Sequence, residues 1–469
     1  MKPVKIKFGT DGWRAIIAQE YTVENVARVS YATAQWVKSN FLNNPSIVIG
    51  HDCRFAGELF AETATKIFLK EGIKVYLAKD FVSTPMVSYA AVELKASLGV
   101  VITASHNPPS YNGYKLKGSF GGPLSPQNVQ EIEDIIPEVC SIDYLNMSLE
   151  NQDLLEYYDM EALYIQAIKD NFDLEAIKNS GLNFAYDAMY GAGQNVLRDL
   201  LPDTTFMHCD ENPSFMGQAP EPIHKNLLEF SEMIRLSDGE IACGLATDGD
   251  ADRIGLYDSK GNFIDSHHIM LLLVNYLHKN KGMTGKVLTA ASSTPRLGVM
   301  AEKFGLDFEV VKVGFKYIAA LMLEEDVLLG GEESGGIAIK GHIPERDGIW
   351  MGLVIWEYMA KSGKTLEELI EEVYEIVGPF KYQRDDLHIT EELKVSIMEK
   401  CEADGFQSFG DYKVISIDKT DGFKFFFSNG EWLMIRASGT EPVLRTYAES
   451  HDLEAAQRIL KACKEEIGA

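Results

Sequence analysis

The stretch LGVVITASHN, residues 98–107, sets the fold class because an apolar run passes directly into a polar loop. Its first part, 98–105, reads as a fully buried β-strand. IACGLATDGD (241–250) and DVLLGGEESGG (326–336) repeat this change from apolar to polar side chains. Strands that are apolar along their whole length are typical of parallel sheets covered on both faces. Since ligands bind beyond the carboxyl ends of such strands, we expect all three loops to carry function.

Predicted helices alternate with strands around these three stretches, which is the α/β pattern. Before the first stretch we expect strands and helices in turn at 46–52, 56–72, 74–80 and 83–96. After it we expect a strand, a turn and a helix over 183–201, a helix at 267–280 and a strand at 285–293. The C-terminal part differs, since residues 413–438 alternate as in an antiparallel meander and a final helix follows.

Length and cysteine content limit the kind of protein. A chain of 469 residues suggests three domains, or four small ones, at about 150 residues each. The polar region 140–155 and the helix 371–378 before Pro379 are the expected boundaries. The six cysteines are scattered and never form C-x-x-C. This pattern fits a reducing cytosol and predicts neither a disulfide framework nor a zinc site.

The net charge is strongly negative, at −26 from 70 acidic and 44 basic residues. This balance argues against nucleic acid or an anionic membrane as the main partner. It is compatible with a phosphorylated small molecule, because a few buried basic groups can reverse the local field. MKPVKIKFGTDGW lacks the apolar core of a signal peptide, and the apolar run around 269–274 is too short to span a bilayer. We therefore expect a soluble cytoplasmic protein.

The loop after the second stretch predicts a metal site. Asp248, Asp250 and Asp252 alternate along it, so their carboxylates can converge on one hard cation if the loop curls. Oxygen-only ligation suits Mg²⁺. An EF-hand is excluded, because its sixth position is Arg253 rather than Gly and its twelfth is Ser259 rather than Glu. A simple Asp-Gly turn is the alternative, although three crowded carboxylates are costly without a cation.

The loop after the first stretch offers a nucleophile. Ser105 leaves the strand at its carboxyl end, and His106, Asn107 and Lys115 are near enough in sequence to surround it. A helix N-cap serine before a proline turn is the equally weighted alternative. G-x-S-x-G is absent from the sequence, so the nucleophile elbow of α/β-hydrolases does not apply.

Two further loops suit a sugar and a phosphate. In GGEESGG, glycines allow close approach, and Glu332 and Ser334 supply an acceptor and a donor for vicinal hydroxyls. RASGTEP, from Arg436 with Arg445 nearby, combines guanidiniums, hydroxyls and glycine N–H groups as a phosphate-binding nest would. The alternatives are a Gly-rich surface turn for the first loop and an ordinary hairpin for the second.

TASHNPPSYNGYK, DGDADR, GGEESGG and RASGTEPVLR, in this order, resemble the four active-site loops of the α-D-phosphohexomutases. FGTDGWRAII is similar to the N-terminal segment of that family, so the resemblance covers essentially the whole chain. It implies an α/β fold of three related α/β domains with mixed sheets plus a C-terminal α+β domain around a central cleft. We expect these domains at 1–145, 155–256, 257–370 and 379–469.

The resemblance also assigns roles, in four groups. Ser105 matches the phosphoserine, and the catalytic candidates beside it are Arg14, His106 and Lys115. One Mg²⁺ per chain would be held by a phosphoserine oxygen of Ser105 with Asp248, Asp250 and Asp252. Sugar contacts would come from Glu332, Ser334, His342 and Arg346. Phosphate contacts would come from Arg253, Lys316, Arg436, Ser438, Gly439, Thr440 and Arg445. Lys115 is the preferred general acid or base, with His106 or His342 as alternatives, because arginine stays charged.

The implied reaction is reversible transfer between glucose 1-phosphate and glucose 6-phosphate through phosphoserine and a hexose 1,6-bisphosphate. Glucose 1,6-bisphosphate would be intermediate and activator. The motifs GEES, VGFK and HIPERDG look closer to phosphoglucomutase than to phosphoglucosamine mutase, whose loop typically reads EQSGH. Gly336 stands where bifunctional relatives often have histidine, and Arg346 where eukaryotic-type phosphoglucomutases have lysine.

Several alternatives stay open at this point. Within the family, phosphomannomutase or phosphoglucosamine mutase activity would use the same loops. A phosphatase could hydrolyse its substrate through the same phosphoserine, and a regulator could bind sugar phosphates without turnover. In each case the partners are small hexose phosphates rather than nucleic acid or membrane, and the chain is expected to be a monomer or homodimer.

Overall fold

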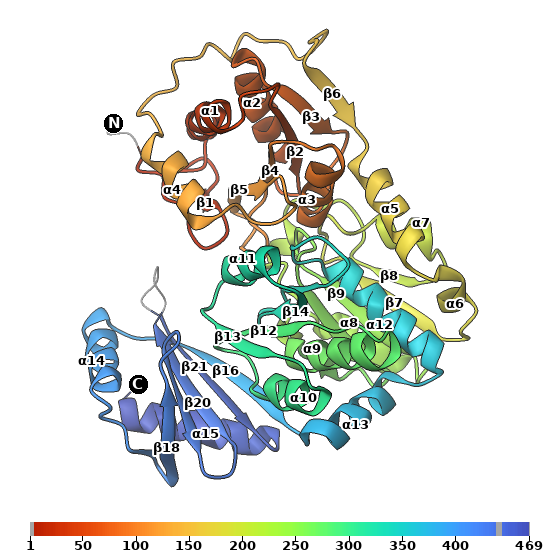
Figure 1. Cartoon of the computed structure of the whole chain (residues 1–469), viewed down its shortest axis with the longest axis vertical. Helices are drawn as coiled ribbons and strands as arrows, with labels where there is room; N and C mark the ends of the chain where they lie inside the picture. The colour runs from red at the N-terminus through yellow and green to blue at the C-terminus, as the bar shows by residue number, and fades with distance from the viewer. Residues whose placement is uncertain (1–3, 438–442, 469) are drawn as a thin grey trace. The chain divides into compact units, whose positions relative to one another are not determined.

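The computed structural model describes residues 4–437 and 443–468. These residues form two compact units: residues 1–286 with 314–370, and residues 287–313 with 371–469. The strands and helices confirm the predicted α/β class, with mixed sheets in the first unit (Figure 1). Each unit is described separately below.

The first sheet has the strand order β1-β5-β4-β2-β3-β6. Its strands are β1 Trp13–Ile16, β2 Ser46–His51, β3 Lys74–Ala78, β4 Leu98–Ile102, β5 Tyr111–Gly118 and β6 Leu155–Tyr158. β2, β3, β4 and β6 run parallel, β5 pairs antiparallel with β4, and β1 pairs antiparallel with β5 at the edge of the sheet. Its helices are α1 Val23–Asn40, α2 Gly57–Lys70, α3 Thr84–Glu93 and α4 Pro126–Asp134. β6 extends this sheet beyond residue 145, where we expected the first domain to end.

The two faces of the first sheet follow from the pleat of its strands. Ile49 and Val100 point toward the core beneath α1 and α2, where they join Phe60. On the opposite face Gly50 lies under α3, and a Cβ there would approach Val82 and Val87 to 2.4 and 2.6 Å. Burying each such side chain contributes about 1.5–3 kcal/mol, so both helix layers pin the strand ends that carry the predicted site.

The second sheet has the order β11-β10-β9-β7-β8. Its strands are β7 Asn183–Asp187, β8 Thr205–Met207, β9 Ile241–Thr247, β10 Ile254–Asp258 and β11 Phe263–Ile264. The accompanying helices are α5 Met160–Asn171, α6 Leu174–Lys178, α7 Val196–Leu200 and α8 Leu228–Leu236. Next come α9 Ser266–Asn275, which continues as a π-helical turn over Tyr276–Asn280, and α12 Gly348–Ser362. Gly352 lets α12 approach β9, since a Cβ there would lie 2.4 Å from Leu245.

The rest of the first unit contains α11 Phe315–Glu324 and the antiparallel pair β14 Val327–Gly331 and β15 Ile337–Ile339. The strand predicted to run into a loop over 326–336 is β14, and the rest of that stretch connects β14 to β15. In the second unit β12, Lys286–Ala290, runs parallel to β13, Phe308–Val311, with α10, Arg296–Phe304, between them in sequence.

The C-terminal part of the second unit is an antiparallel sheet with helices, as the meander pattern predicted. Its strand order is β16-β21-β20-β19-β18-β17. The strands are β16 Lys381–His388, β17 Ser408–Phe409, β18 Tyr412–Asp418, β19 Phe423–Phe427, β20 Trp432–Ala437 and β21 Val443–Ser450. The helices are α13 Leu366–Val377, α14 Glu391–Glu402 and α15 Leu453–Ile467. Phe425, Leu433 and Ile459 belong to the core between sheet and helices.

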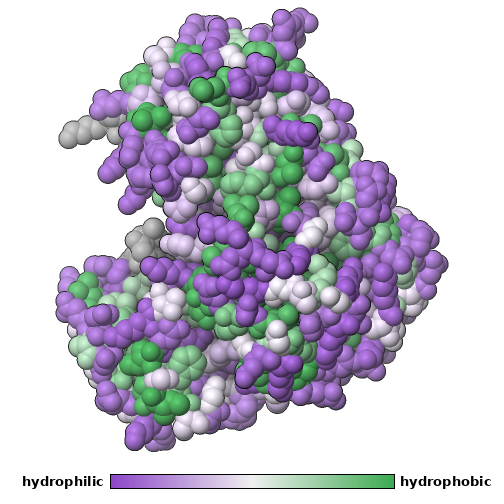
Figure 2. Space-filling view, in the orientation of Figure 1, coloured by the Kyte–Doolittle hydropathy of each residue, from purple (hydrophilic) through white to green (hydrophobic). Residues whose placement is uncertain are grey.

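Figure 2 shows one face of the molecule, on which many hydrophilic side chains are mixed with apolar ones, in keeping with the high content of charged residues. Across the two described ranges, every helix is too short or too polar to traverse a lipid bilayer.

Candidate active site

Ser105 and the aspartate loop meet in the first unit. Ser105 Oγ donates a hydrogen bond to Asp248 Oδ2 at 2.7 Å, although the two residues are far apart in sequence. Both side chains are buried. Strands β4 and β9 lead into these two loops, and each pairs in parallel with a neighbouring strand. The loops at the carboxyl ends of the two strands therefore meet. A serine oxygen beside a carboxylate cluster is the arrangement expected for a phosphoryl acceptor next to a metal.

The backbone around Ser105 is held in an unusual conformation. Ser105 has φ +52°, a left-handed value that costs energy for a non-glycine residue. Its N–H donates to Thr103 Oγ1 at 2.9 Å. Arg54 donates to the carbonyl oxygens of Ser105, Asn107, Pro108 and Tyr111. Asp52 pairs with Arg54 at 3.3 Å, and both side chains are fully buried. Sequence reasoning missed Arg54, whose only signal is its place directly after strand 46–51.

The three aspartates form a group that fits a metal ion. One carboxylate oxygen from each lies within 4.8 Å of the others, and all three residues are buried. Asp250 Oδ1 and Asp252 Oδ1 find no hydrogen-bond donor in the described part of the chain, so two buried oxygens are left for a ligand. Asp248 Oδ1 accepts from the N–H groups of Asp252 and Arg253, which curls the loop. The all-oxygen set fits Mg²⁺.

The pKa values of two carboxyl groups in this loop shift in opposite directions. Burial, with Asp250 and Asp252 nearby, raises the pKa of Asp248 well above its usual range. Burial alone would also raise the pKa of Asp250, but Lys115 and a hydrogen bond from Thr84 lower it below its ordinary value. Thr84 Oγ1 lies 2.5 Å from Asp250 Oδ2, a contact that the sequence did not predict. A divalent cation would remove the repulsion that this crowding creates.

Lys115 and Arg346 lie against the same carboxylates. Lys115 Nζ is 2.7 Å from Asp250 Oδ2, 3.0 Å from Asp252 Oδ2 and 2.9 Å from Asp11 Oδ2. Burial would lower the pKa of Lys115, but Asp11 and the two aspartates raise it, so the lysine stays charged. Arg346 pairs with Asp252 at 2.7 Å and also with Asp11. Lys115, predicted beside the serine, and Arg346, predicted as a sugar contact, therefore both lie against the aspartate loop.

Arg14, His106 and Arg253 complete the surroundings of Ser105. Arg14 donates to Asn107 Oδ1 at 2.7 Å, and His106 Nδ1 lies 3.3 Å from Ser105 Oγ. Burial lowers the pKa of His106 well below its usual range, and Arg253 and Arg14 lower it further. The imidazole is therefore neutral near pH 7. Arg253 Nη1 lies 3.8 Å from Glu221 Oε1, and the arginine side chain is mostly buried.

The sugar loop presents a buried carboxyl group. Glu332 Oε1 accepts from the N–H of Gly314 at 2.8 Å. Burial raises the pKa of Glu332 to about 7, Arg346 opposes this, and Glu333 adds to it. Gly336 stands where bifunctional relatives often have histidine. In this chain a Cβ at that position would lie 2.4 Å from Arg346 Cδ, so glycine fits beside the arginine. Ser334 lies half-buried in the same loop.

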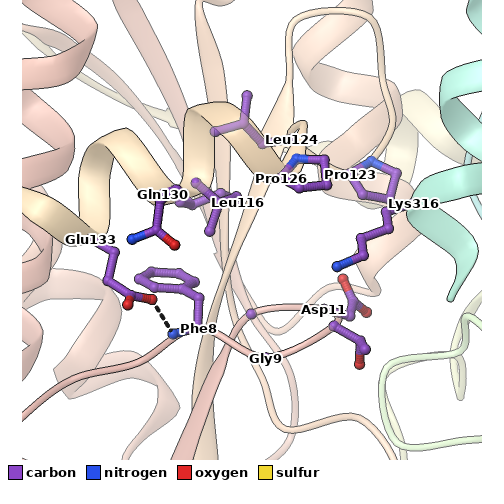
Figure 3. A pocket seen from close by; sticks show the side chains of 13 residues that line it. Phe8, Gly9, Asp11, Leu116, Pro123, Leu124, Pro126, Gln130, Glu133 and Lys316 are labelled. Carbon is purple, nitrogen blue, oxygen red and sulfur yellow. Dashed lines mark hydrogen bonds between the residues drawn. The ribbon is translucent and has the colours of Figure 1, made fainter.

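His342 and Lys316, two predicted contacts, lie in other surroundings. His342 Nε2 is 2.9 Å from Asp347 Oδ2, and its ring stacks on Trp350 with centroids 3.8 Å apart. Asp347 also caps α12, so this imidazole has the partners typical of a structural residue. Lys316 lines a pocket together with Asp11, and Figure 3 shows its side chain extending into that pocket.

The predicted phosphate residues belong to the second unit. Arg436 on β20 and Arg445 on β21 are directly paired across the strands. Arg436 lies 3.3 Å from Asp421, and Arg445 lies 3.8 Å from Asp386. Like charges in opposite positions destabilise a sheet, so the pair is suited to an anion that would lie between them. Ser438, Gly439 and Thr440 lie outside the described residues.

Comparison with known proteins agrees with this geometry. Models of phosphoglucomutase/phosphomannomutase α/β/α domains I, II and III match residues 5–141, 162–261 and 265–377, and the C-terminal domain model matches 390–466. A phosphoglucomutase/phosphomannomutase of Thermococcus kodakarensis is 32% identical, with 97% of this chain and 96% of that protein covered. This chain belongs to the phosphoglucomutase/phosphomannomutase family.

Other members of the phosphoglucomutase/phosphomannomutase family carry different names. A phosphoglucosamine mutase of Methanococcus maripaludis is 29% identical, with 92% of this chain and 93% of that protein covered. A crystal structure from Thermus thermophilus, described as a phosphomannomutase, matches with a TM-score of 0.87 and 31% identity and covers 100% of both chains. The chain is thus a phosphohexomutase, an isomerase of hexose phosphates, while its relatives differ in the sugar they are named for.

Proposed function

We propose that this phosphohexomutase moves a phosphoryl group between the 1- and 6-oxygens of a hexose through phosphorylated Ser105. One observation carries the proposal: Ser105 Oγ lies 2.7 Å from Asp248, inside a buried triad of carboxylates that fits Mg²⁺. When bound, the metal would neutralise negative charge on the transferring group. A hexose 1,6-bisphosphate is the intermediate in this proposal, and glucose 1,6-bisphosphate is the predicted activator.

The chain's own residues then act at each end of the transfer. The bond between phosphorus and Ser105 Oγ breaks as a bond forms from phosphorus to a sugar hydroxyl oxygen, which loses its proton. Lys115 and Arg14 remain cations throughout, and they stabilise charge on the transferring oxygens, the largest part of catalysis in phosphoryl transfer. Lys115, the general acid or base favoured by the sequence, stays charged because Asp11 and the aspartate loop raise its pKa. Glu332, with a pKa of about 7, takes its place as the group that can accept or return a hydroxyl proton near neutral pH. Reversal with the other phosphate at Ser105 regenerates the phosphoserine.

For the sugar we propose glucosamine phosphate ahead of the glucose phosphate that the loop motifs favoured. Several relatives are named phosphoglucosamine mutases, including those of Methanococcus maripaludis and Staphylococcus saprophyticus. Charge offers a physical reason, because Glu332 and Glu333 give the sugar loop two neighbouring carboxyl groups. An ammonium group at the 2-position would be attracted to them, whereas a hydroxyl gains only a neutral hydrogen bond.

Coupled assays with glucosamine 1-phosphate, glucose 1-phosphate and mannose 1-phosphate test the function and the sugar together. We expect 6-phosphate product from all three, with kcat/KM for glucosamine 1-phosphate higher by about tenfold or more. An equal or higher value for glucose or mannose would reject the sugar preference. Release of inorganic phosphate without isomerised product would instead indicate the phosphatase alternative. Intact-protein mass before and after phosphatase treatment reports the state of Ser105.

A further inference from the structure

Asp11 lies at the centre of a group of four basic side chains. Its Oδ2 atom is 2.9 Å from Lys115 Nζ and pairs with Arg346. Lys117 Nζ is 3.6 Å from Oδ1, and Arg14 lies 4.0 Å from Oδ2. The aspartate side chain is only 14% exposed. A mostly buried carboxylate with so many cations is unlike a surface ion pair and organises the positive charge of the site.

The segment around Asp11 is fixed from outside the cation group. Gly12 has φ +97°, and a Cβ there would lie 2.7 Å from the carbonyl oxygen of Tyr114. On the other side, Phe8 N–H donates to Glu133 Oε2 at 2.7 Å, the bond drawn in Figure 3. β1 pairs with β5 with Trp13 opposite Tyr114, which brings the segment beside Lys115. The position of Asp11 is thus set by backbone packing rather than by the cations themselves.

Two of these cations are shared between Asp11 and the metal carboxylates. Lys115 contacts Asp11 on one side and Asp250 and Asp252 on the other. The Arg346 guanidinium likewise contacts both Asp11 and Asp252. Both cations contact the Oδ2 atoms of these carboxylates, while Asp250 Oδ1 and Asp252 Oδ1 find no hydrogen-bond donor in the described part of the chain and stay open for a divalent cation. Asp11 offers both cations a second anionic partner that is not a metal ligand.

We propose that Asp11 is a positioning residue that keeps Lys115 and Arg346 at the Oδ2 atoms of the metal carboxylates, away from the open Oδ1 atoms, and orients them toward the phosphoryl group on Ser105. The role in orientation rests on the proposed function, whereas the effect on the metal does not. Without the charge on Asp11, Lys115 is left with Asp250 and Asp252 as partners, and Arg346 with Asp252 and Glu345. Both cations can then shift toward the open carboxylate oxygens. They then oppose metal binding and no longer face the transferring group in a fixed geometry.

The test is Mn²⁺ binding to full-length, phosphatase-treated protein without substrate, followed by electron paramagnetic resonance. We expect Asp11→Asn to weaken Mn²⁺ binding by about tenfold or more, as removal of partners behind metal ligands commonly does. We expect kcat to fall by a similar factor with KM for the sugar phosphate changed less than about threefold. Mn²⁺ affinity within about twofold of the wild type would overturn the proposal.

Glu133→Ala is the matched control, because it removes only the bond to Phe8, while the pairing of β1 with β5 still holds the Asp11 segment beside Lys115. Its Mn²⁺ affinity should stay within about twofold of the wild type; a loss equal to that of Asp11→Asn would assign the effect to backbone loosening and reject the proposal. If Asp11→Asn does not fold, Asp11→Glu replaces it. The displaced carboxylate should lower kcat, and unchanged kcat and Mn²⁺ affinity would also reject the role.

The two proposals can fail separately. A wild-type protein that isomerises no hexose phosphate would refute the proposed function. The loss of Mn²⁺ affinity in Asp11→Asn would still be measurable in that protein, because the experiment uses no substrate.

Discussion

The two charged sites of the chain handle like charges in opposite ways. In the first unit three aspartates are crowded together with no exposed surface, and buried cations surround them. In the second unit Arg436 and Arg445 face each other across two strands and remain 18% and 30% exposed, and each pairs with one aspartate, at 3.3 and 3.8 Å. Transfer chemistry needs fixed charges in a dry site, whereas a residue that only grips a phosphate can stay in contact with water. The first site should therefore control kcat and the second KM.

Ser105→Ala gives the sharpest test of that division. Without the hydroxyl, no phosphoserine forms, so we expect turnover to fall by about 10⁴-fold or more. Binding of a hexose phosphate, measured by calorimetry, should persist because the alanine removes no recognition group. Turnover close to that of the wild type would mean that another residue carries the phosphoryl group.

Asp250→Asn and metal removal should produce the next largest effects. One carboxylate fewer weakens metal binding, and we expect kcat to fall by roughly 10²–10³-fold. Dialysis of the wild type against a chelator should abolish activity, and Mg²⁺ should restore it. Full activity after exhaustive chelation would show that the triad has no metal-dependent role.

Arg436→Ala should affect the second site alone. Loss of one phosphate-binding guanidinium is expected to raise KM by about 10–100-fold, with a smaller change in kcat and no change in Mn²⁺ affinity. Arg445→Ala, at the paired position, is the matched comparison and should have a smaller effect because it is a supporting contact. If either variant lowers kcat as much as Asp250→Asn, the division between the two sites is wrong.

Glu332 supplies the smallest effect, a dependence of stability on pH. Its pKa is about 7 in the folded protein, against an ordinary value of 4.5 for glutamate. The folded state therefore holds a proton that the unfolded state has released between these values, so this contribution is present below pH 4.5 and is lost as the pH rises through 7. Relative to Glu332→Gln, the wild type should lose roughly 1–3 kcal/mol of unfolding free energy over that range. Thermal melts from pH 5 to 8 measure it, and parallel curves for the two proteins would contradict the assignment.

Local patterns in the sequence were sufficient to predict the strands of the first unit and the functional residues that follow them. Ser105 and the aspartates were predicted because each comes directly after an apolar strand. The two strands, β4 and β9, belong to different sheets, and tertiary packing brings their loops together. The meander at 413–438 was also predicted from a local pattern, because the alternation of apolar and polar side chains is visible within a single strand. The chemistry of these loops could therefore be predicted before any tertiary contact was known.

Residues that act through long-range packing could not be predicted in this way. Asp11 reaches Lys115 because β1 pairs with β5, a register that no local pattern contains. Arg54 binds carbonyl oxygens of a loop contributed by another strand. His342 shows the converse, because it lies near Arg346 in sequence while its ring packs on Trp350. Side-chain direction within a loop depends on what the fold brings next to it.

The guanidinium of Arg54 has a consequence for the whole reaction cycle. It fastens the serine loop through main-chain oxygens alone, so the loop keeps its shape whether Ser105 carries an ester or a free hydroxyl. In the proposed reaction, each half-reaction adds a phosphoryl group to Ser105 or removes it, and the carbonyl oxygens bound by Arg54 are not the atoms that change. On this proposal the phosphoryl group is donated and recovered on a loop whose main chain keeps one conformation.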